Sequence, residues 1–288
     1  MFLKQLLKYE KRSVMLSEAS CFIMSRIFIQ PPDHNSFDTF LSYAKEHGYN
    51  LEIASFAYSR VLDSNWQEIL RDHQRKLCGF TGMISLHGAF MELIVHSRDK
   101  RIREVARDRI FQNLEIAKAL NAKYVVFHGN FNPLIRHESY KKNWSKQNAI
   151  FWSEVLEKYH IIVVLENLWD PTPEMFRKLL DEVKSSRLKI CLDTGHTNIF
   201  SEAPLEEWFS VLGEDIAYVH VNDNKGEVDD ELAPGEGNIN WRKFSDLIEK
   251  YGIAPEIVFE VGTLEKTMQS LKYFQKENIY PFNSCHKC

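Results

Sequence analysis

The chain has 288 residues, and its 36 basic and 40 acidic side chains give a formal net charge of −4. This balance excludes the strongly basic composition typical of proteins that bind nucleic acid through its phosphates, so we expect no nucleic-acid partner. No stretch approaches the roughly eighteen consecutive apolar residues of a membrane span, so we expect no membrane partner either. The five cysteines are irregularly spaced and no secretory leader is visible, which favours reduced thiols and a cytoplasmic protein.

The pattern of the chain begins after a charged, amphipathic start. We predict that residues 1–23 form an N-terminal extension, that 24–280 form one catalytic barrel domain, and that 281–288 form a C-terminal tail. The tail contains Cys285, His286 and Cys288. This C-x-x-C spacing has no second half, so we interpret the tail as a simple terminus and not as a zinc motif.

Short apolar runs alternate along the chain with longer segments of helical spacing. The predicted strands cover 26–30, 51–56, 84–89, 124–128, 161–166, 188–193, 216–221 and 257–261. The predicted helices cover 36–47, 66–77, 98–120, 139–159, 173–184, 204–213, 240–251 and 263–277. Ser36 is a candidate N-cap for the first helix, and Gly48 and Gly252 are candidate C-caps.

Eight strands that alternate with eight helices indicate an α/β protein with a parallel sheet. Nearly continuous apolar strands such as IIVVL at 161–165 are typical of a sheet covered on both faces. Eight such units in one chain favour a closed (β/α)8 TIM barrel over an open, doubly wound sheet. No linker, repeat or low-complexity tract suggests a second domain.

Polar side chains stand at the carboxyl ends of six predicted strands. They are His87, His128, Glu166, Asp193, His220 with Asp223, and Glu260. In a parallel barrel all these ends open onto one face, where the active sites of such barrels are assembled. A single histidine in a strand is most often a packed core residue, and a single acid at a strand end is often a helix cap. Six together would crowd unpaired carboxylates unless a cation offset their charge, so the pattern predicts a divalent-metal site.

Three motifs in the second half of the chain carry a family resemblance. CLDTGH at 191–196, HVNDN at 220–224 and PGEG at 234–237, with the glutamates that end the fifth and eighth strands, resemble the xylose-isomerase-like TIM-barrel superfamily. That superfamily holds sugar (phosphate) isomerases and epimerases, inosose dehydratases and the endonuclease IV type of AP endonuclease. The resemblance covers roughly residues 24–280 and is strongest at 161–261.

The resemblance implies a metal centre of the epimerase type, with Glu166, Asp193, His220 and Glu260 as ligands. Three carboxylates and one imidazole suit one divalent ion, Mn²⁺ or Mg²⁺ first, with Co²⁺ or Zn²⁺ also compatible. It further implies a sugar, sugar-phosphate or polyol substrate whose isomerisation or epimerisation runs through a 1,2-enediolate. Glu166 and Glu260 would be the catalytic acid/base pair.

Other polar and aromatic residues are expected to contact the substrate. His196, three residues after Asp193, would hold a substrate oxygen, although a role in loop packing stays open. Trp169 is the best candidate for an aromatic wall of the pocket. The remaining expected contacts are His87, His128, Asp229 and Glu231. Many such barrels form homo-oligomers, and the sequence does not decide whether this one does.

Two alternatives use the same residues. An inosose-type dehydratase would form the same enolate and then expel a β-hydroxyl. An endonuclease IV-type phosphodiesterase would hold three zinc ions and cleave abasic DNA, with His87, His128, Asp229 and Glu231 among their ligands. In that type a histidine stands at the position of Glu231, and the loop around it, which contains Glu227 and Asp230, is too acidic for DNA. The sequence therefore favours a small sugar.

Overall fold

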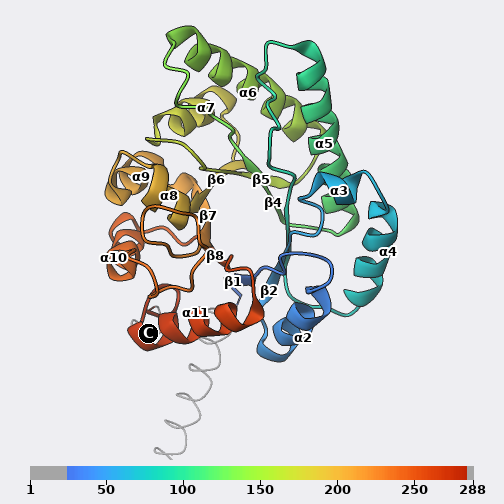
Figure 1. Ribbon diagram of the computed structural model, residues 1–288, viewed down its shortest axis with the longest axis vertical. Coiled ribbons are helices and arrows are strands. Elements are labelled where there is room, and N and C mark those ends of the chain that lie inside the picture. Colours follow the sequence, from blue (N-terminus) through green and yellow to red (C-terminus); the bar gives the residue numbers. More distant parts are fainter. Residues whose placement is uncertain (1–24, 284–288) are drawn as a thin grey trace, which may run out of the picture.

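The computed structural model describes residues 25–283, which form a closed barrel ringed by helices (Figure 1). The predicted extension 1–23 lies outside the described residues, as do Cys285, His286 and Cys288 of the predicted tail. Within the described part, no helix is long and apolar enough to cross a membrane.

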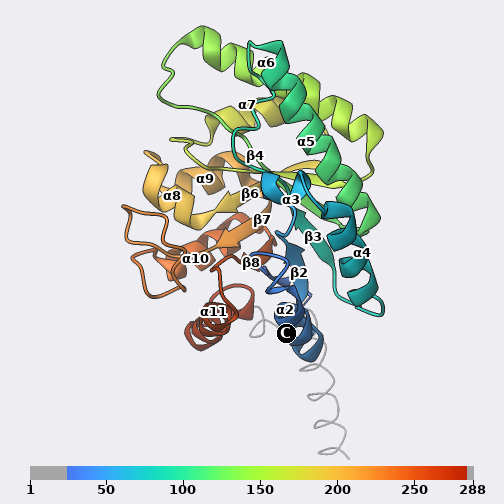
Figure 2. The ribbon, with the colours of Figure 1, turned by 45° about the vertical axis from the view of Figure 1, so that its right-hand side comes forward.

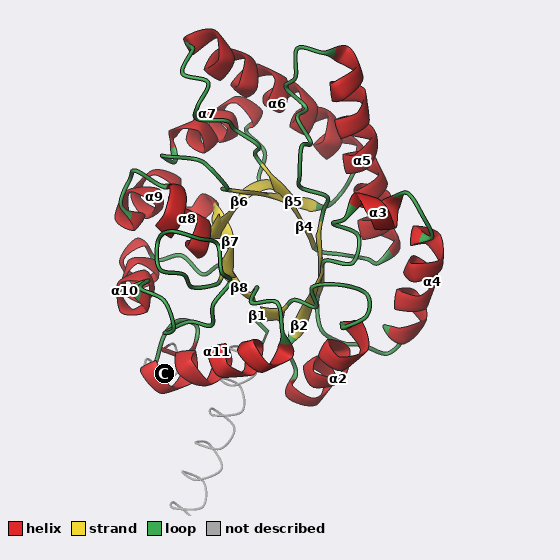
Figure 3. Cartoon of the chain, viewed as in Figure 1, coloured by secondary structure: helices red, strands yellow, loops and turns green. Residues whose placement is uncertain are grey.

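Eight parallel strands close the barrel in sequence order, β1 pairing with both β2 and β8 (Figure 3). The strands are β1 Ile27–Ile29, β2 Asn50–Ile53, β3 Ile84–His87, β4 Tyr124–His128, β5 Ile162–Glu166, β6 Leu188–Asp193, β7 Ile216–Val221 and β8 Glu256–Phe259. Almost every strand residue is buried, because the barrel interior covers one face and the helices cover the other. The predicted TIM barrel is confirmed.

The helices surround the strands on the outside, as two views separated by 45° show (Figure 2). They are α2 Phe37–His47, α3 Ser59–Leu62, α4 Trp66–Lys76, α5 Lys100–Ala119, α6 Glu138–Lys158, α7 Glu174–Val183, α8 Thr194–Phe200, α9 Leu205–Leu212, α10 Trp241–Tyr251 and α11 Leu264–Glu277, with a 3-10 turn η1 Gly213–Asp215. All eight predicted helices are present within two residues at each end. The short helices α3 and α8 were not predicted; each lies in the loop after a strand.

The helix caps follow the sequence with one exception. Gly48 and Gly252 end α2 and α10 with φ of 73° and 62°, the left-handed conformation that glycine adopts without a Cβ penalty. Ser36 occupies the N-cap position of α2, as predicted, but its side chain makes no capping bond. The Ser36 hydroxyl instead donates to the backbone oxygen of Asp33, 3.0 Å away, and so closes a turn before the helix.

An apolar layer fills the barrel directly beneath the polar end. Its members include Phe28, Val126, Val164, Cys191, Tyr218 and Val258. Each lies two residues before a polar residue at the strand end, namely Gln30, His128, Glu166, Asp193, His220 and Glu260. Because side chains alternate along a strand, residues two apart point to the same side. The strands therefore hold a ring of polar side chains on a packed hydrophobic floor.

Candidate metal centre

The four predicted metal ligands come from four consecutive strands. Glu166 and Asp193 are the last residues of β5 and β6, His220 is in β7, and Glu260 follows β8. The ladder pairs Asp193 with His220, which places these two side by side. One ligand atom from each of the four residues lies within 4.8 Å of all the others. The structure thus brings together the complete ligand set that the family resemblance implies.

His220 stands at the centre of this set. Its Nδ1 lies 2.7 Å from Oε2 of Glu260, 3.3 Å from Oε2 of Glu166 and 4.0 Å from Oδ2 of Asp193. Glu166, Asp193 and His220 are at most 1% exposed. Three carboxylates this close would repel one another strongly in a buried site unless a positive charge lay between them.

Unsatisfied buried atoms in the cluster fit a metal ion. Among the described residues, neither Oε2 of Glu166 nor Nδ1 of His220 has a hydrogen bond of good geometry. Buried polar atoms are rarely left without a partner, since an unmade hydrogen bond costs about 1–3 kcal/mol. Both atoms face the space between the carboxylates. A divalent cation there would satisfy both, and the donor set of three carboxylates and an imidazole suits such an ion.

The other ring nitrogen of His220 contacts a carboxylate that the sequence analysis did not select. Nε2 of His220 lies 2.9 Å from Oε1 of Glu52, a fully buried residue of β2. Gln30, just after β1, donates from Nε2 to Glu52 at 2.9 Å and to Glu260 at 2.8 Å. Metal-binding histidines commonly donate their second N–H to such a carboxylate, which fixes the tautomer. An acid inside the apolar run LEIASF was the available signal for Glu52.

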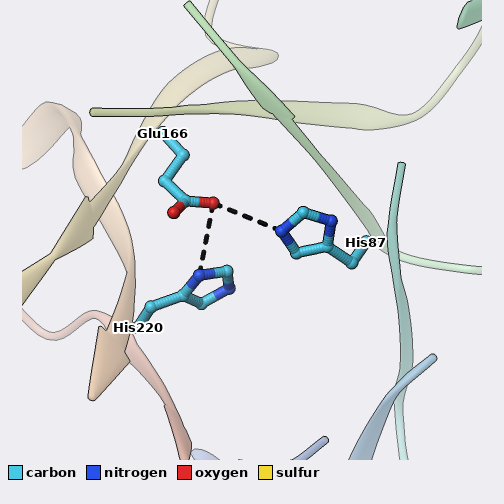
Figure 4. Close-up of side chains that lie close together, drawn as sticks. All are labelled: His87, Glu166 and His220. Atoms are coloured by element: carbon cyan, nitrogen blue, oxygen red, sulfur yellow. Dashed lines mark ion pairs between the residues drawn. The ribbon is translucent and has the colours of Figure 1, made fainter. Parts of the chain in front are cut away.

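Two further histidines lie against Glu166. Nε2 of His128 is 3.1 Å from its Oε2, and Nε2 of His87 is 3.4 Å from the same oxygen. Figure 4 shows the Glu166 carboxylate between the rings of His87 and His220. His87, Glu166 and His220 also form a second group whose ligand atoms lie within 4.8 Å of one another. The predicted residues His87 and His128 therefore belong to the same cluster.

His196 and Asp229 lie on the β6–β7 side of the cluster. Nδ1 of His196 is 3.1 Å from Oε1 of Glu166 and 2.9 Å from the backbone oxygen of Asn167. Its Nε2 is 3.2 Å from Oδ2 of Asp229. The backbone N–H of His196 donates to Oδ1 of Asp193 at 2.6 Å, which caps α8 and holds that carboxylate. His196 thus connects two predicted ligands to the loop after β7.

The glycine of the DTGH motif makes room for another contact to Asp193. Nδ2 of Asn222 donates to Oδ2 of Asp193 at 2.9 Å. A Cβ on Gly195 would lie 1.8 Å from Oδ1 of Asn222, an impossible approach. Any other residue at this position would displace the amide that orients Asp193. The requirement for Gly195 is therefore local to the candidate metal centre.

The pKa values reflect the crowding of charge. Burial and the nearby charges of Glu166 and Glu260 raise the pKa of Asp193 to about 7, although His196 and His220 act in the opposite direction. Burial also favours protonation of Glu260, but His220 overrides this and lowers its pKa to about 2. For His87, burial lowers the pKa, and the carboxylates of Glu166, Glu260 and Glu52 outweigh it and raise the pKa to about 9. Without a metal, protons on histidines balance the carboxylates.

A cavity of about 290 Å³ opens above the cluster. It is lined by Glu166, Asp193 and Glu260 and by the predicted contact residues His87, His128, His196, Trp169, Asp229 and Glu231. Trp169, one of the lining residues, is 38% exposed. Glu231 has a positive φ of 45°, and burial and the charges of Glu260 and Asp229 raise its pKa to about 7. All predicted substrate-contact residues therefore border one space.

Comparison with known proteins identifies the class of this barrel. The model of the xylose isomerase-like TIM-barrel family matches residues 21–277, so the chain belongs to that family. It is 25% identical over 280 residues to the uncharacterized protein MJ1311 of Methanocaldococcus jannaschii, covering 93% of this chain and 92% of that one.

Two solved structures share the fold. A D-tagatose 3-epimerase-like protein superimposes with a TM-score of 0.73 at 23% identity, covering 90% of this chain and 98% of the other. The IOLI protein with a bound zinc atom superimposes with a TM-score of 0.68 at 17% identity, covering 91% of this chain and 100% of the other. These neighbours share the barrel fold, in agreement with membership of the xylose isomerase-like TIM-barrel family.

Proposed function

We propose that this protein is a divalent-metal-dependent isomerase or epimerase of a sugar, sugar phosphate or polyol. The observation that carries the proposal is the convergence of Glu166, Asp193, His220 and Glu260 within 4.8 Å, with the three carboxylates lining a cavity. Membership of the xylose isomerase-like family supports it. The comparison with an epimerase-like protein agrees with it at the level of the fold.

The four residues would hold one ion, Mn²⁺ or Mg²⁺ by preference for oxygen ligands, with Co²⁺ or Zn²⁺ compatible. When bound, the ion would polarise the carbonyl and hydroxyl oxygens of the substrate and so acidify the carbon between them. Glu52 would receive the Nε2 proton of His220, leaving Nδ1 free to act as a ligand. Gln30 would keep Oε1 of Glu260 in place from the opposite side.

The proton transfer would be carried by two carboxylates. Glu166 and Glu260 both line the cavity and approach the same His220 nitrogen, at 3.3 and 2.7 Å. One, as the carboxylate, would remove the proton from the substrate carbon, giving an enediolate, and the other, in its protonated form, would donate a proton to that carbon or its neighbour. The charge of His128 stabilises the ionised form of Glu166, whose pKa lies well below its usual value although burial acts against this. Ionised carboxylates are the form that a general base requires.

Metal content and isotope exchange test this proposal together. We would measure bound metal per chain by mass spectrometry after loading with Mn²⁺ or Zn²⁺. We would then incubate the loaded protein with ketoses, inososes and their phosphates in D₂O and follow deuterium into the product. One ion per chain and deuterium on the carbon beside the carbonyl are expected.

The same experiment distinguishes the alternatives. Loss of water from an inosose would indicate the dehydratase. The group of His87, Glu166 and His220 is the one observation that favours a site with more than one metal. Three zinc ions per chain, with cleavage of abasic DNA and no exchange with any sugar, would overturn the proposal in favour of a phosphodiesterase.

A further inference from the structure

A second cavity lies beside the cavity of the candidate metal centre. Its volume is about 690 Å³, and it is formed by the loops after β3, β4 and β5. Met91 and Trp169 line both cavities. Since active-site residues of a barrel stand on the loops after the strands, this second space is on the functional face of the molecule.

Apolar and polar side chains together line the second cavity, and several of the apolar ones are exposed. Ile94, Ile135 and Tyr140 contribute to it, along with the two shared residues. Met91 is 57% exposed, Ile135 43% and Trp169 38%, so three of the eight exposed large hydrophobic residues in the described chain gather here. Exposed apolar surface that is gathered in one concave place is typical of a binding site.

One of the polar residues that line this cavity is a buried histidine. His96 is 3% exposed, and within residues 25–283 its Nδ1 has no hydrogen-bond partner. Its Nε2 lies 3.2 Å from the hydroxyl of Tyr140. Burial lowers the pKa of His96 to about 4, so the ring is neutral and adds an uncharged surface. Apolar walls with a few polar groups are the usual composition of small-molecule sites.

The size of the two cavities suggests how they are used. Pockets for ligands of drug size measure about 300–1,000 Å³. The cavity above the candidate metal centre, at about 290 Å³, is at the small end of this range. A single sugar would fill it, and a further group on that sugar could extend past Met91 and Trp169, which line both cavities. The second cavity lies directly beyond these two residues.

We propose that the second cavity binds a hydrophobic ring attached to the sugar, so that the substrate is a glycoside-like conjugate whose sugar still carries the carbonyl and adjacent hydroxyl that the proposed reaction needs, and not a free monosaccharide. This inference rests on the proposed function, because it assigns the reacting sugar to the metal cavity. Aromatic side chains bind rings and C–H faces well, and Trp169 borders both parts of such a ligand.

Binding to pairs of glycosides tests the inference. Isothermal titration calorimetry on the Mn²⁺-loaded full chain would compare phenyl and methyl glycosides of glucose, galactose and mannose. Burial of a phenyl ring should make at least one phenyl glycoside bind about 10-fold more tightly than its methyl partner. Ile135→Asp should abolish that preference by placing a charge in the apolar lining. Equal binding of both partners in every pair, or no binding of any phenyl glycoside, would overturn the inference.

A neighbouring residue provides the matched control. Leu134 is 81% exposed and does not line this cavity. Leu134→Asp should therefore keep the preference for the phenyl ring. If Ile135→Asp and Leu134→Asp both lose this preference, the assignment of the ring to this cavity is contradicted.

A metal-site variant distinguishes the inference from the proposed function. Asp193→Asn should weaken metal binding yet leave the ratio of phenyl to methyl affinity unchanged. If the ratio of phenyl to methyl affinity persists while the metal-loaded wild-type protein exchanges deuterium with no sugar, the proposed reaction fails and the ring site stands. If the wild-type protein exchanges deuterium with free monosaccharides and shows no preference for phenyl glycosides, the proposed reaction stands and the ring site fails.

Discussion

The two halves of the barrel contribute different things to the candidate metal centre. The second half, β5–β8, supplies all four residues of the proposed ligand set. The first half, β1–β4, supplies Gln30, Glu52, His87 and His128, each of which contacts one of those four. In the proposed metal centre, the second half would thus offer the ligand atoms, and the first half would orient these atoms and balance their charge.

This division has a physical reason. A carboxylate that binds a metal must be deprotonated and held in one rotamer, and its neighbours do both. Glu166 illustrates this, because His87 and His128 of the first half both approach its Oε2. If the division is correct, changes in the second half should remove metal and turnover, whereas changes in the first half should weaken them by smaller factors.

The largest effect is expected from a ligand of the second half. Glu260→Gln removes a metal ligand and a group that can accept a proton, so kcat should fall by about 10²–10⁴-fold. Steady-state kinetics and bound metal per chain would measure both losses. Glu256→Gln is the control, since Glu256 is a buried acid at the start of the same strand, β8, and contacts Lys123 and Tyr124 instead of the candidate ligands. Wild-type turnover in Glu260→Gln would disprove the catalytic role.

The next effect concerns the stability of the metal-free protein. A histidine whose folded pKa is raised stabilises the fold fully below its ordinary pKa, and this stability is lost as the pH rises through the folded pKa. For His87 the interval runs from 6.5 to about 9 and corresponds to about 3 kcal/mol. The Tm of metal-free protein should therefore fall between these pH values. His196, whose pKa is also raised, acts in the same direction.

Two comparisons check the origin of this pH dependence. Bound Mn²⁺ should flatten it, because the ion takes over the balance of charge from the protons. His87→Asn should reduce it in the metal-free protein, as measured by calorimetric scans at pH 6.5 and 9. A metal-free Tm that stays constant or rises over this interval would show that the first half does not balance the carboxylates.

The same division explains what the sequence could predict. The candidate ligands of the second half stand at strand ends, and Asp193 and His220 lie inside the recognisable motifs DTGH and HVNDN. Because a parallel barrel brings all these strand ends to one face, the convergence of the four residues could be predicted from the barrel alone. Glu52 was missed because it lies within the strand and reaches the candidate ligands through His220 and Gln30. Gln30 was missed because an amide at a strand end suggests neither metal binding nor proton transfer. The loop helix α8 was also missed, because Asp193, the residue that caps it, was assigned only to the metal site.

A change at Glu52 should have an intermediate effect. Glu52→Gln keeps the size of the side chain but removes the negative charge that lies 2.9 Å from Nε2 of His220. Metal affinity should fall by about 10–100-fold, with turnover restored at saturating metal. Titration with a competing chelator would measure the affinity, and ¹⁵N shifts of His220 would report its tautomer. Unchanged affinity and tautomer would mean that Glu52 is only a packed core residue.

The smallest effect is expected at Trp169, which lines the metal cavity but does not belong to the candidate ligand set. Trp169 is 38% exposed and borders the metal cavity without contacting the four candidate ligands in any hydrogen bond or ion pair of the described chain. Trp169→Ala should raise KM by about 2–10-fold, the value of one aromatic contact, and leave kcat within about twofold. Leu134→Ala, at a more exposed side chain outside this cavity, should change neither constant. A fall in kcat at constant KM would instead show that Trp169 acts in the transition state. Trp169 would then have to be grouped with the residues of the second half that are proposed to act directly in the reaction.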